Sequence, residues 1–167
     1  GVIGNKGEGL VQDLSLQDAC FARVYTYGKA AGAHGAVVTG SRLLKDYLVN
    51  FSRSFIYTTA LPLTAVAAIR HAYKVIPTMS AERGRISTLV DLFRESPMRY
   101  QVLDSDTPIQ GVLTGGNEEA RSVSARLAKE GFDARPILYP TVPKGSERVR
   151  IILHAFNTVE DTQKLLS

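Results

Sequence analysis

One helical stretch, residues 62–95, divides this sequence into two parts with different patterns. Pro62 suits the first turn of an alanine-rich helix that we expect to run to about Ile76. Pro77 must interrupt this helix, because proline has no N–H to donate and its ring clashes with the preceding turn. Helical spacing then resumes, with one apolar face formed by Ile86, Leu89, Val90 and Phe93. A connecting helical region therefore separates residues 1–61 from residues 96–167.

Residues 1–61 predict two short strands joined by a turn. Residues 22–27 are rich in β-forming side chains, and residues 35–40 form an apolar run bounded by glycines. We expect residues 28–34 to make the turn between these strands. Ser41 can cap an amphipathic helix, and residues 54–58 are expected to be extended again.

From about Ser96 the sequence alternates short strands with a helix, which predicts a small α/β domain. We expect strands at residues 109–114, 132–138 and 148–154. Asn117 is expected to cap the helix that follows the first of these strands, with Gly131 just past its end. Thr158 and Asp161 have the spacing of a capping box at the start of a last helix. The fold class predicted for the chain is α/β.

The composition disfavours several classes of protein. Apolar residues make up 44% and charged residues 22%, so neither disorder nor a fibrous fold is indicated. The apolar runs are far shorter than the roughly 20 residues of a membrane helix, and no signal peptide is recognisable, which predicts a cytoplasmic protein without a membrane partner. The single cysteine, Cys20, cannot form an intrachain disulfide and is expected to be a small core residue.

The distribution of charged residues and of histidines predicts neither a nucleic-acid site nor a metal site. The net charge of +4 is spread along the chain without a run of five like charges, so no nucleic-acid partner is expected. His34, His71 and His154 lack a second ligand at metal-binding spacing. A non-enzymatic binding module with a basic surface remains an alternative to an enzyme.

Lys29 lies in a segment with the properties of a covalent cofactor site. A lysine that forms a Schiff base must lie on a fixed turn, with small neighbours that let the cofactor approach. Lys29 follows the first predicted strand and is flanked by Gly28, Ala30 and Ala31. Solvated turn lysines show the same pattern, so this segment alone leaves both interpretations open.

Four segments of the sequence resemble, in order, the motifs of one enzyme family. They read T-Y-G-K-A-A-G (residues 26–32), F-I-Y-T-T-A-L-P (55–62), S-D-T-P-I (105–109) and P-T-V-P-K-G-S-E-R-V-R (140–150). These segments resemble the T-x-G-K-A-x-G, F-S-T-A-L-P, S-x-S-P-I and P-T-V-P-x-G-x-x-R-L-R motifs of the α-oxoamine synthases, which are pyridoxal 5'-phosphate (PLP) enzymes. The resemblance covers nearly the whole chain.

The resemblance implies a role for each matching residue. Lys29 would hold PLP as a Schiff base and move protons at the substrate α-carbon, and Thr26 would bind the cofactor phosphate. Thr58 and Thr59 would reach the phosphate in the neighbouring subunit, which implies a homodimer with a shared active site. Without the resemblance, Thr58 and Thr59 would be ordinary hydroxyls at a strand end.

Thr141 and Arg150 match the substrate-binding positions of the family. Thr141 would contact the substrate, and Arg150 would bind the carboxylate of the amino acid. Guanidinium groups form bidentate hydrogen bonds with carboxylates, which suits this role. Strand alternation places Arg150 on the face opposite Val149 and Ile151, so it can be presented to a site. A solvated strand face, with Thr141 as a turn residue, is the alternative.

The resemblance also implies the fold and the reaction. The chain would be the C-terminal part of a fold-type-I PLP transferase, with a remnant of the large cofactor-binding domain at residues 1–61. Residues 62–95 would connect it to a small α/β domain at residues 96–167. The implied reaction condenses an amino acid, L-alanine, with an acyl-CoA, pimeloyl-CoA, with loss of carbon dioxide, as in biotin synthesis. Family members that use glycine with an acetyl group, or serine with a palmitoyl group, share these motifs and remain alternatives.

The family motif D-x-A-H-x-T-G would precede Gly1. Its Asp pairs with the pyridine nitrogen of PLP, and its His assists the ring. The cofactor acts as an electron sink only when that nitrogen is protonated and the ring is fixed. We therefore expect the 167-residue chain alone to have little or no activity.

Overall fold

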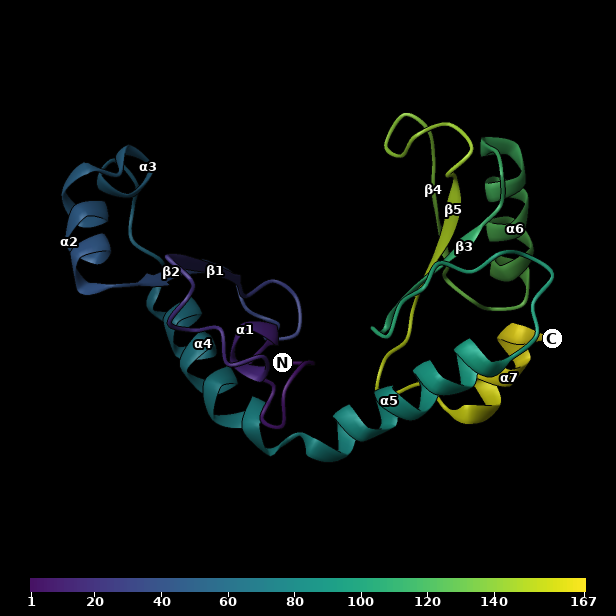
Figure 1. Cartoon of the computed structure of the whole chain (residues 1–167), viewed down its shortest axis with the longest axis horizontal. Helices are drawn as coiled ribbons and strands as arrows, with labels where there is room; N and C mark the ends of the chain where they lie inside the picture. The colour runs from purple at the N-terminus through teal and green to yellow at the C-terminus, as the bar shows by residue number, and fades with distance from the viewer. The chain divides into compact units, whose positions relative to one another are not determined.

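The structure is a computed structural model that describes residues 1–167. The chain forms two compact units. Unit 1 comprises Gly1–Ser80 and unit 2 comprises Ala81–Ser167 (Figure 1). Each unit contains its own sheet. No helix of the chain combines the length and the apolar character needed to cross a membrane.

Unit 1 is built on a two-stranded antiparallel sheet (Figure 1). Its elements are α1 (Leu10–Asp13), β1 (Ala22–Thr26), β2 (Ala36–Gly40), α2 (Arg42–Phe51), α3 (Arg53–Ile56), α4 (Leu63–Val75) and the 3-10 turn η1 (Ile76–Thr78). The Ser41 hydroxyl accepts a hydrogen bond from the backbone N–H of Leu44 at 3.1 Å, so the predicted cap of α2 is confirmed. Both predicted strands and the interruption of the helix at Pro77 are also confirmed.

The prediction of an extended segment at residues 54–58 is wrong, because α3 forms there. The backbone N–H groups of Phe55 and Ile56 both donate to the carbonyl of Ser52, at 2.9 Å each. The sheet of unit 1 contains only β1 and β2, so no neighbouring strand bonds these groups. The chain satisfies them locally instead, and the β-forming side chains do not decide the structure.

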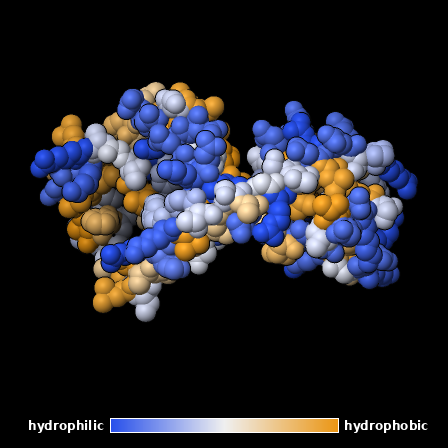
Figure 2. Space-filling view, turned by 90° about the horizontal axis from the view of Figure 1, so that it is seen from below, coloured by the Kyte–Doolittle hydropathy of each residue, from blue (hydrophilic) through white to orange (hydrophobic).

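Unit 1 buries few apolar side chains. Only Tyr27 and Ala33 are buried hydrophobic residues, and Figure 2 shows apolar side chains at the surface. Cys20, expected in a core, is half-buried.

Unit 2 is a three-stranded antiparallel sheet with helices (Figure 1). Its elements are α5 (Ser80–Glu95), β3 (Ile109–Leu113), α6 (Asn117–Lys129), β4 (Arg135–Ile137), β5 (Arg148–Ile152) and α7 (Val159–Leu166). The strand order is β3-β5-β4, so the last strand in sequence lies in the middle. β4 is shorter than the predicted strand at residues 132–138, because its ladder with β5 spans only three residue pairs.

The core of unit 2 forms where α5 and β5 contribute their apolar faces. Phe93 and Val149 are fully buried, and Leu89 and Val90 from α5 pack in the same cluster. Along β5 and the residue that follows it, the buried Val149, Ile151 and Leu153 alternate with more exposed positions. The apolar faces predicted for both elements are therefore confirmed.

Capping in unit 2 follows the sequence at one helix and departs from it at another. The capping box of α7 is confirmed, since Thr158 Oγ1 accepts from the Asp161 N–H and the Asp161 carboxylate accepts from the Thr158 N–H. Asn117, however, does not cap α6, whose N-cap is Gly116. Its amide instead donates to the carbonyl of Tyr139 at 3.3 Å and accepts from the Tyr139 N–H at 2.9 Å. An amide carries both a donor and an acceptor, so it can bond both backbone groups of one residue.

Candidate functional site

A cavity of about 610 Å³ in unit 1 contains the two residues predicted to bind the cofactor within one subunit. Thr26 ends β1, Lys29 follows in the next turn, and both residues line the cavity. Small side chains, Ala30 and Ala31, line it beside the lysine. The volume lies within the roughly 300–1,000 Å³ of small-molecule sites.

Backbone hydrogen bonds fix the turn that carries Lys29. The Tyr27 N–H donates to the carbonyl of Gly35, and the Tyr27 carbonyl accepts from the Ala33 N–H, each at 2.9 Å. Inside this loop the Gly32 N–H donates to the Lys29 carbonyl at 2.9 Å. Gly32 has a φ of 59° and Gly35 a φ of 125°, which glycine adopts more readily than other residues. The lysine is exposed, on a turn with a defined backbone.

A pair of tyrosines forms another part of the cavity wall. The Tyr27 and Tyr73 hydroxyls are 3.1 Å apart, and their rings meet edge to face with centroids 6.0 Å apart. Burial, followed by the hydrogen bond with Tyr73, raises the pKa of Tyr27 to about 12. The Tyr27 phenol therefore stays protonated at neutral pH, and its hydroxyl is engaged with that of Tyr73.

No pattern in the sequence indicates this pair of hydroxyls. Tyr27 stands where the α-oxoamine synthase motif usually has phenylalanine or leucine, and Tyr73 lies 46 residues later on α4. Only the packing of α4 brings the second hydroxyl to the first.

A glycine-rich segment completes the cavity. Lys6, Gly7, Glu8 and Gly9 line it, and the two glycines have φ values of 72° and 97°. Gly7 is buried. A Cβ atom at Gly7 would lie 2.8 Å from the backbone oxygen of Gly1, so only glycine lets the two backbones approach this closely.

Thr58 and Thr59 do not line the cavity that contains Lys29. Both residues are exposed and lie between α3 and α4. The structure therefore does not bring them to the cofactor residues of the same chain. Their predicted role at the neighbouring subunit requires exposed positions and remains a prediction.

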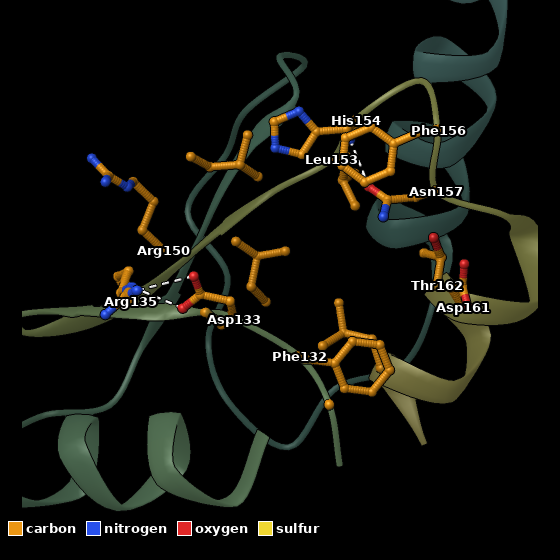
Figure 3. A pocket seen from close by; sticks show the side chains of 15 residues that line it. Phe132, Asp133, Arg135, Arg150, Leu153, His154, Phe156, Asn157, Asp161 and Thr162 are labelled. Carbon is orange, nitrogen blue, oxygen red and sulfur yellow. Dashed lines mark hydrogen bonds and ion pairs between the residues drawn. The ribbon is translucent and has the colours of Figure 1, made fainter. Parts of the chain in front are cut away.

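Arg150 lies at a second cavity, of about 470 Å³, within unit 2 (Figure 3). The β4–β5 ladder ends at the pair Arg135 and Arg150, while β5 continues to Ile152 along β3. The cavity lies where residues 131–134 diverge from β5. His154 and Phe156 stack at its rim, with ring centroids 4.9 Å apart and planes inclined by 8°.

The two arginines of β5 differ in their contacts. Arg148 donates from Nε to the carbonyl of Ser146 at 2.9 Å, whereas the Arg150 side chain forms no hydrogen bond or ion pair. Arg150 is exposed and therefore available to a ligand. Thr141 follows the cis peptide bond between Tyr139 and Pro140, is exposed, and does not line this cavity.

The sequence places this chain in a known family. Residues 4–167 match the family Aminotransferase class I and II. The chain belongs to this family. The family resemblance and the α/β fold class predicted from the sequence, that of fold-type-I PLP transferases, are confirmed.

Individual relatives and solved structures agree with this assignment. The chain is 42% identical over 168 residues to the 8-amino-7-oxononanoate synthase of Methylobacillus flagellatus and 38% identical over 174 residues to that of Emericella nidulans. In both comparisons the match covers 99% of this chain and 42% of the relative, so the chain spans less than half the length of these relatives.

The crystal structure of 8-amino-7-oxononanoate synthase from Francisella tularensis matches with a TM-score of 0.89 and 27% identity, over 99% of this chain and 49% of that one. Serine palmitoyltransferase of Sphingomonas wittichii matches with a TM-score of 0.86 over 98% of this chain and 42% of that one. At 19% identity this second likeness shows the fold alone.

Proposed function

We propose that the complete protein is a PLP-dependent acyltransferase that condenses an amino acid with an acyl-CoA and releases carbon dioxide. The specific activity we propose is that of 8-amino-7-oxononanoate synthase in biotin synthesis, with L-alanine and pimeloyl-CoA as substrates. The observation that carries the proposal is that Thr26 and Lys29 line one cavity of about 610 Å³. Relatives named 8-amino-7-oxononanoate synthase, at up to 42% identity, support the choice of reaction.

The residues of the cavity in unit 1 fit a small planar cofactor that carries an aldehyde and a phosphate. The Lys29 amine is the group that would hold the aldehyde carbon, and the Thr26 hydroxyl is suited to donate a hydrogen bond to the phosphate. Ala30 and Ala31 leave room for a ring close to the backbone. When bound, PLP supplies an electron sink for charge that develops at the substrate α-carbon.

With PLP and the amino acid bound, the Lys29 amine would be the group placed to accept the α-proton of the amino acid. The backbone hydrogen bonds of the turn fix the position from which the Lys29 side chain reaches the cavity. The Tyr27 and Tyr73 hydroxyls, bonded to each other, form part of the same wall.

Substrate and subunit contacts complete the proposal. Arg150 would bind the carboxylate of the amino acid, and Thr141 would contact the substrate. Thr58 and Thr59 would reach the cofactor phosphate of a second subunit, so the proposed form is a cytoplasmic homodimer. In this proposal residues 1–61 belong to the large cofactor-binding domain, residues 62–95 connect the domains, and residues 96–167 form the small domain.

Glycine C-acetyltransferase and serine palmitoyltransferase remain the alternatives within the same chemistry. The structural likeness to serine palmitoyltransferase, with a TM-score of 0.86, shows the fold and does not extend to its substrates. The identity to 8-amino-7-oxononanoate synthases therefore favours L-alanine. Release of CoA from pimeloyl-CoA with L-alanine, from acetyl-CoA with glycine and from palmitoyl-CoA with L-serine would rank the three activities.

Borohydride reduction of the complete protein tests the cofactor site directly. Reduction fixes the cofactor covalently to the lysine that holds it, and peptide mapping then locates the label. We expect the label on Lys29, and loss of the visible cofactor band in Lys29→Ala. Lys6 lines the same cavity, so Lys6→Ala is the matched control and should keep both the band and the label. A label on any other lysine would refute the proposed site.

A further inference from the structure

Arg135 and Arg150 face each other across two strands. They are direct partners in the antiparallel register of β4 and β5, so their side chains lie on the same face of the sheet. Both are exposed and line the cavity of about 470 Å³. Two like charges in this arrangement repel each other unless a third group intervenes.

Asp133 is that third group, and it binds only Arg135. Its Oδ1 atom is 2.7 Å from Arg135 Nε, and its Oδ2 atom accepts from Arg135 Nη2 at 3.0 Å. This is the bidentate arrangement that suits a guanidinium and a carboxylate. Figure 3 shows both contacts, with the Arg150 side chain extending away from the pair.

The other carboxylate of this cavity is also bound. Asp161 accepts a hydrogen bond from the backbone N–H of Thr158 in the capping box of α7. Both acidic residues that line the cavity are therefore engaged, and Arg150 is left as the arginine without a partner.

We infer that Arg135 is a positioning residue for substrate recognition: it holds Asp133 so that Arg150 stays free to bind the substrate carboxylate. This inference rests on the proposed function, because it takes the carboxylate of the amino acid as the ligand of Arg150. Arg135 acts through Asp133 and does not itself contact the substrate.

The position of Asp133 explains why it must be held. It lies two residues before Arg135 in a segment that leads into β4, and Arg135 is the cross-strand partner of Arg150. A carboxylate attached to the same chain competes with free ligand at an effective concentration on the order of millimolar. Without Arg135, Asp133 pairs with Arg150 and occupies the site. Loss of the positive charge of Arg135 therefore weakens carboxylate binding, because the freed Asp133 blocks Arg150.

A double-mutant cycle in the complete protein tests this inference. The variants are Arg135→Gln, Asp133→Asn and the double variant. The dissociation constant of L-alanine is read from the change in the cofactor absorbance, without turnover. We expect Arg135→Gln to weaken L-alanine binding by about two- to sixfold, because the freed carboxylate competes for Arg150 with the strength of an exposed ion pair, about 0.2–1 kcal/mol. The double variant should return to within about twofold of the parent, because the competitor is gone. Binding in the double variant as weak as in Arg135→Gln would overturn the inference.

The side-chain Nε–H resonance of Arg150 gives a second readout that does not need the cofactor. Acetate should shift this resonance in the parent protein. In Arg135→Gln the resonance should already be shifted without acetate, and Asp133→Asn in that background should reverse the shift. An Arg150 resonance that is unmoved in Arg135→Gln would show that Asp133 does not capture it, and the inference would fail.

The ion pair between Arg94 and Asp104 is the matched control. It is exposed, has a distance of 3.2 Å, belongs to unit 2 and does not line the cavity. Arg94→Gln should leave L-alanine and acetate binding unchanged. If the parent binds acetate at Arg150 but shows no response to L-alanine, the proposed function fails, and only the competition between Asp133 and a carboxylate ligand for Arg150 remains supported. If acetate does not shift the Arg150 resonance of the parent, the inference itself fails.

Discussion

Replacing Tyr73 with phenylalanine removes one hydroxyl from the Lys29 cavity and keeps the ring. The edge-to-face contact with Tyr27 is retained, so Tyr73→Phe isolates the hydrogen bond of 3.1 Å between the hydroxyls. A hydrogen bond between uncharged groups contributes about 0.5–1.5 kcal/mol to stability. Tyr27 is only 8% exposed, so water replaces the lost partner poorly. We expect Tyr73→Phe to lower the free energy of unfolding at neutral pH by about 1 kcal/mol.

The same variant should change the titration of Tyr27. Burial and the hydrogen bond with Tyr73 raise the pKa of Tyr27 from 10.0 to about 12, so the folded state holds this proton more tightly than the unfolded state. The resulting stabilisation is complete below pH 10 and is lost as the pH rises to about 12. A shift of this size corresponds to at most about 2.7 kcal/mol. Tyr73→Phe removes the hydrogen bond and leaves the burial, so the pKa of Tyr27 should fall toward its ordinary value.

The ultraviolet absorbance of tyrosinate, measured against pH in the complete protein, follows this titration. Tyr27→Phe identifies the component that belongs to Tyr27. Tyr57→Phe removes a phenol that is 80% exposed and should leave that component in place. Urea unfolding at neutral pH gives the change in stability. If Tyr73→Phe changes neither the titration of Tyr27 nor the free energy of unfolding, the hydrogen bond does not hold the cavity wall.

Three further substitutions test the packing and capping of unit 2. Phe93→Ala empties a fully buried position and should cost about 3–5 kcal/mol in urea unfolding, whereas a cost below about 1 kcal/mol would contradict its place in the core. Thr158→Ala removes the cap of α7 and should cost about 0.5–2 kcal/mol, and Thr158→Ser should restore most of it if the hydroxyl is responsible. Asn117→Ala removes the two bonds to Tyr139 and should accelerate hydrogen exchange at the Tyr139 amide, while unchanged exchange would show that water replaces the amide fully.

The sequence predicted the elements whose cause is local. The alternation along β5, the apolar face of α5 and the capping box at Thr158 depend on residues within a few positions of each other. The shared cavity of Thr26 and Lys29 is of the same kind, because a strand end and the following turn place them close together.

The errors arose where a distant partner decides the structure. Residues 54–58 are rich in β-forming side chains but have no strand to pair with, so α3 forms. Asn117 has the composition of a cap, yet Tyr139, 22 residues later, uses its amide. Tyr73 reaches Tyr27 across 46 residues, and only strand pairing places Arg135 opposite Arg150. None of these contacts has a periodic signature in the sequence.

The two units also differ in what holds their cavities. Unit 2 has a cluster of buried side chains around Phe93 and Val149, so its cavity beside Arg150 rests on a packed core. Unit 1 leaves large side chains such as Leu43, Tyr57 and Leu63 at least 80% exposed. The wall of its Lys29 cavity depends instead on the backbone hydrogen bonds of the turn and on the Tyr27 hydroxyl pair. A substitution in the Tyr27–Tyr73 pair should therefore alter cofactor binding. It should lower the free energy of unfolding less than a core substitution in unit 2 does, because unit 1 has few buried contacts to lose.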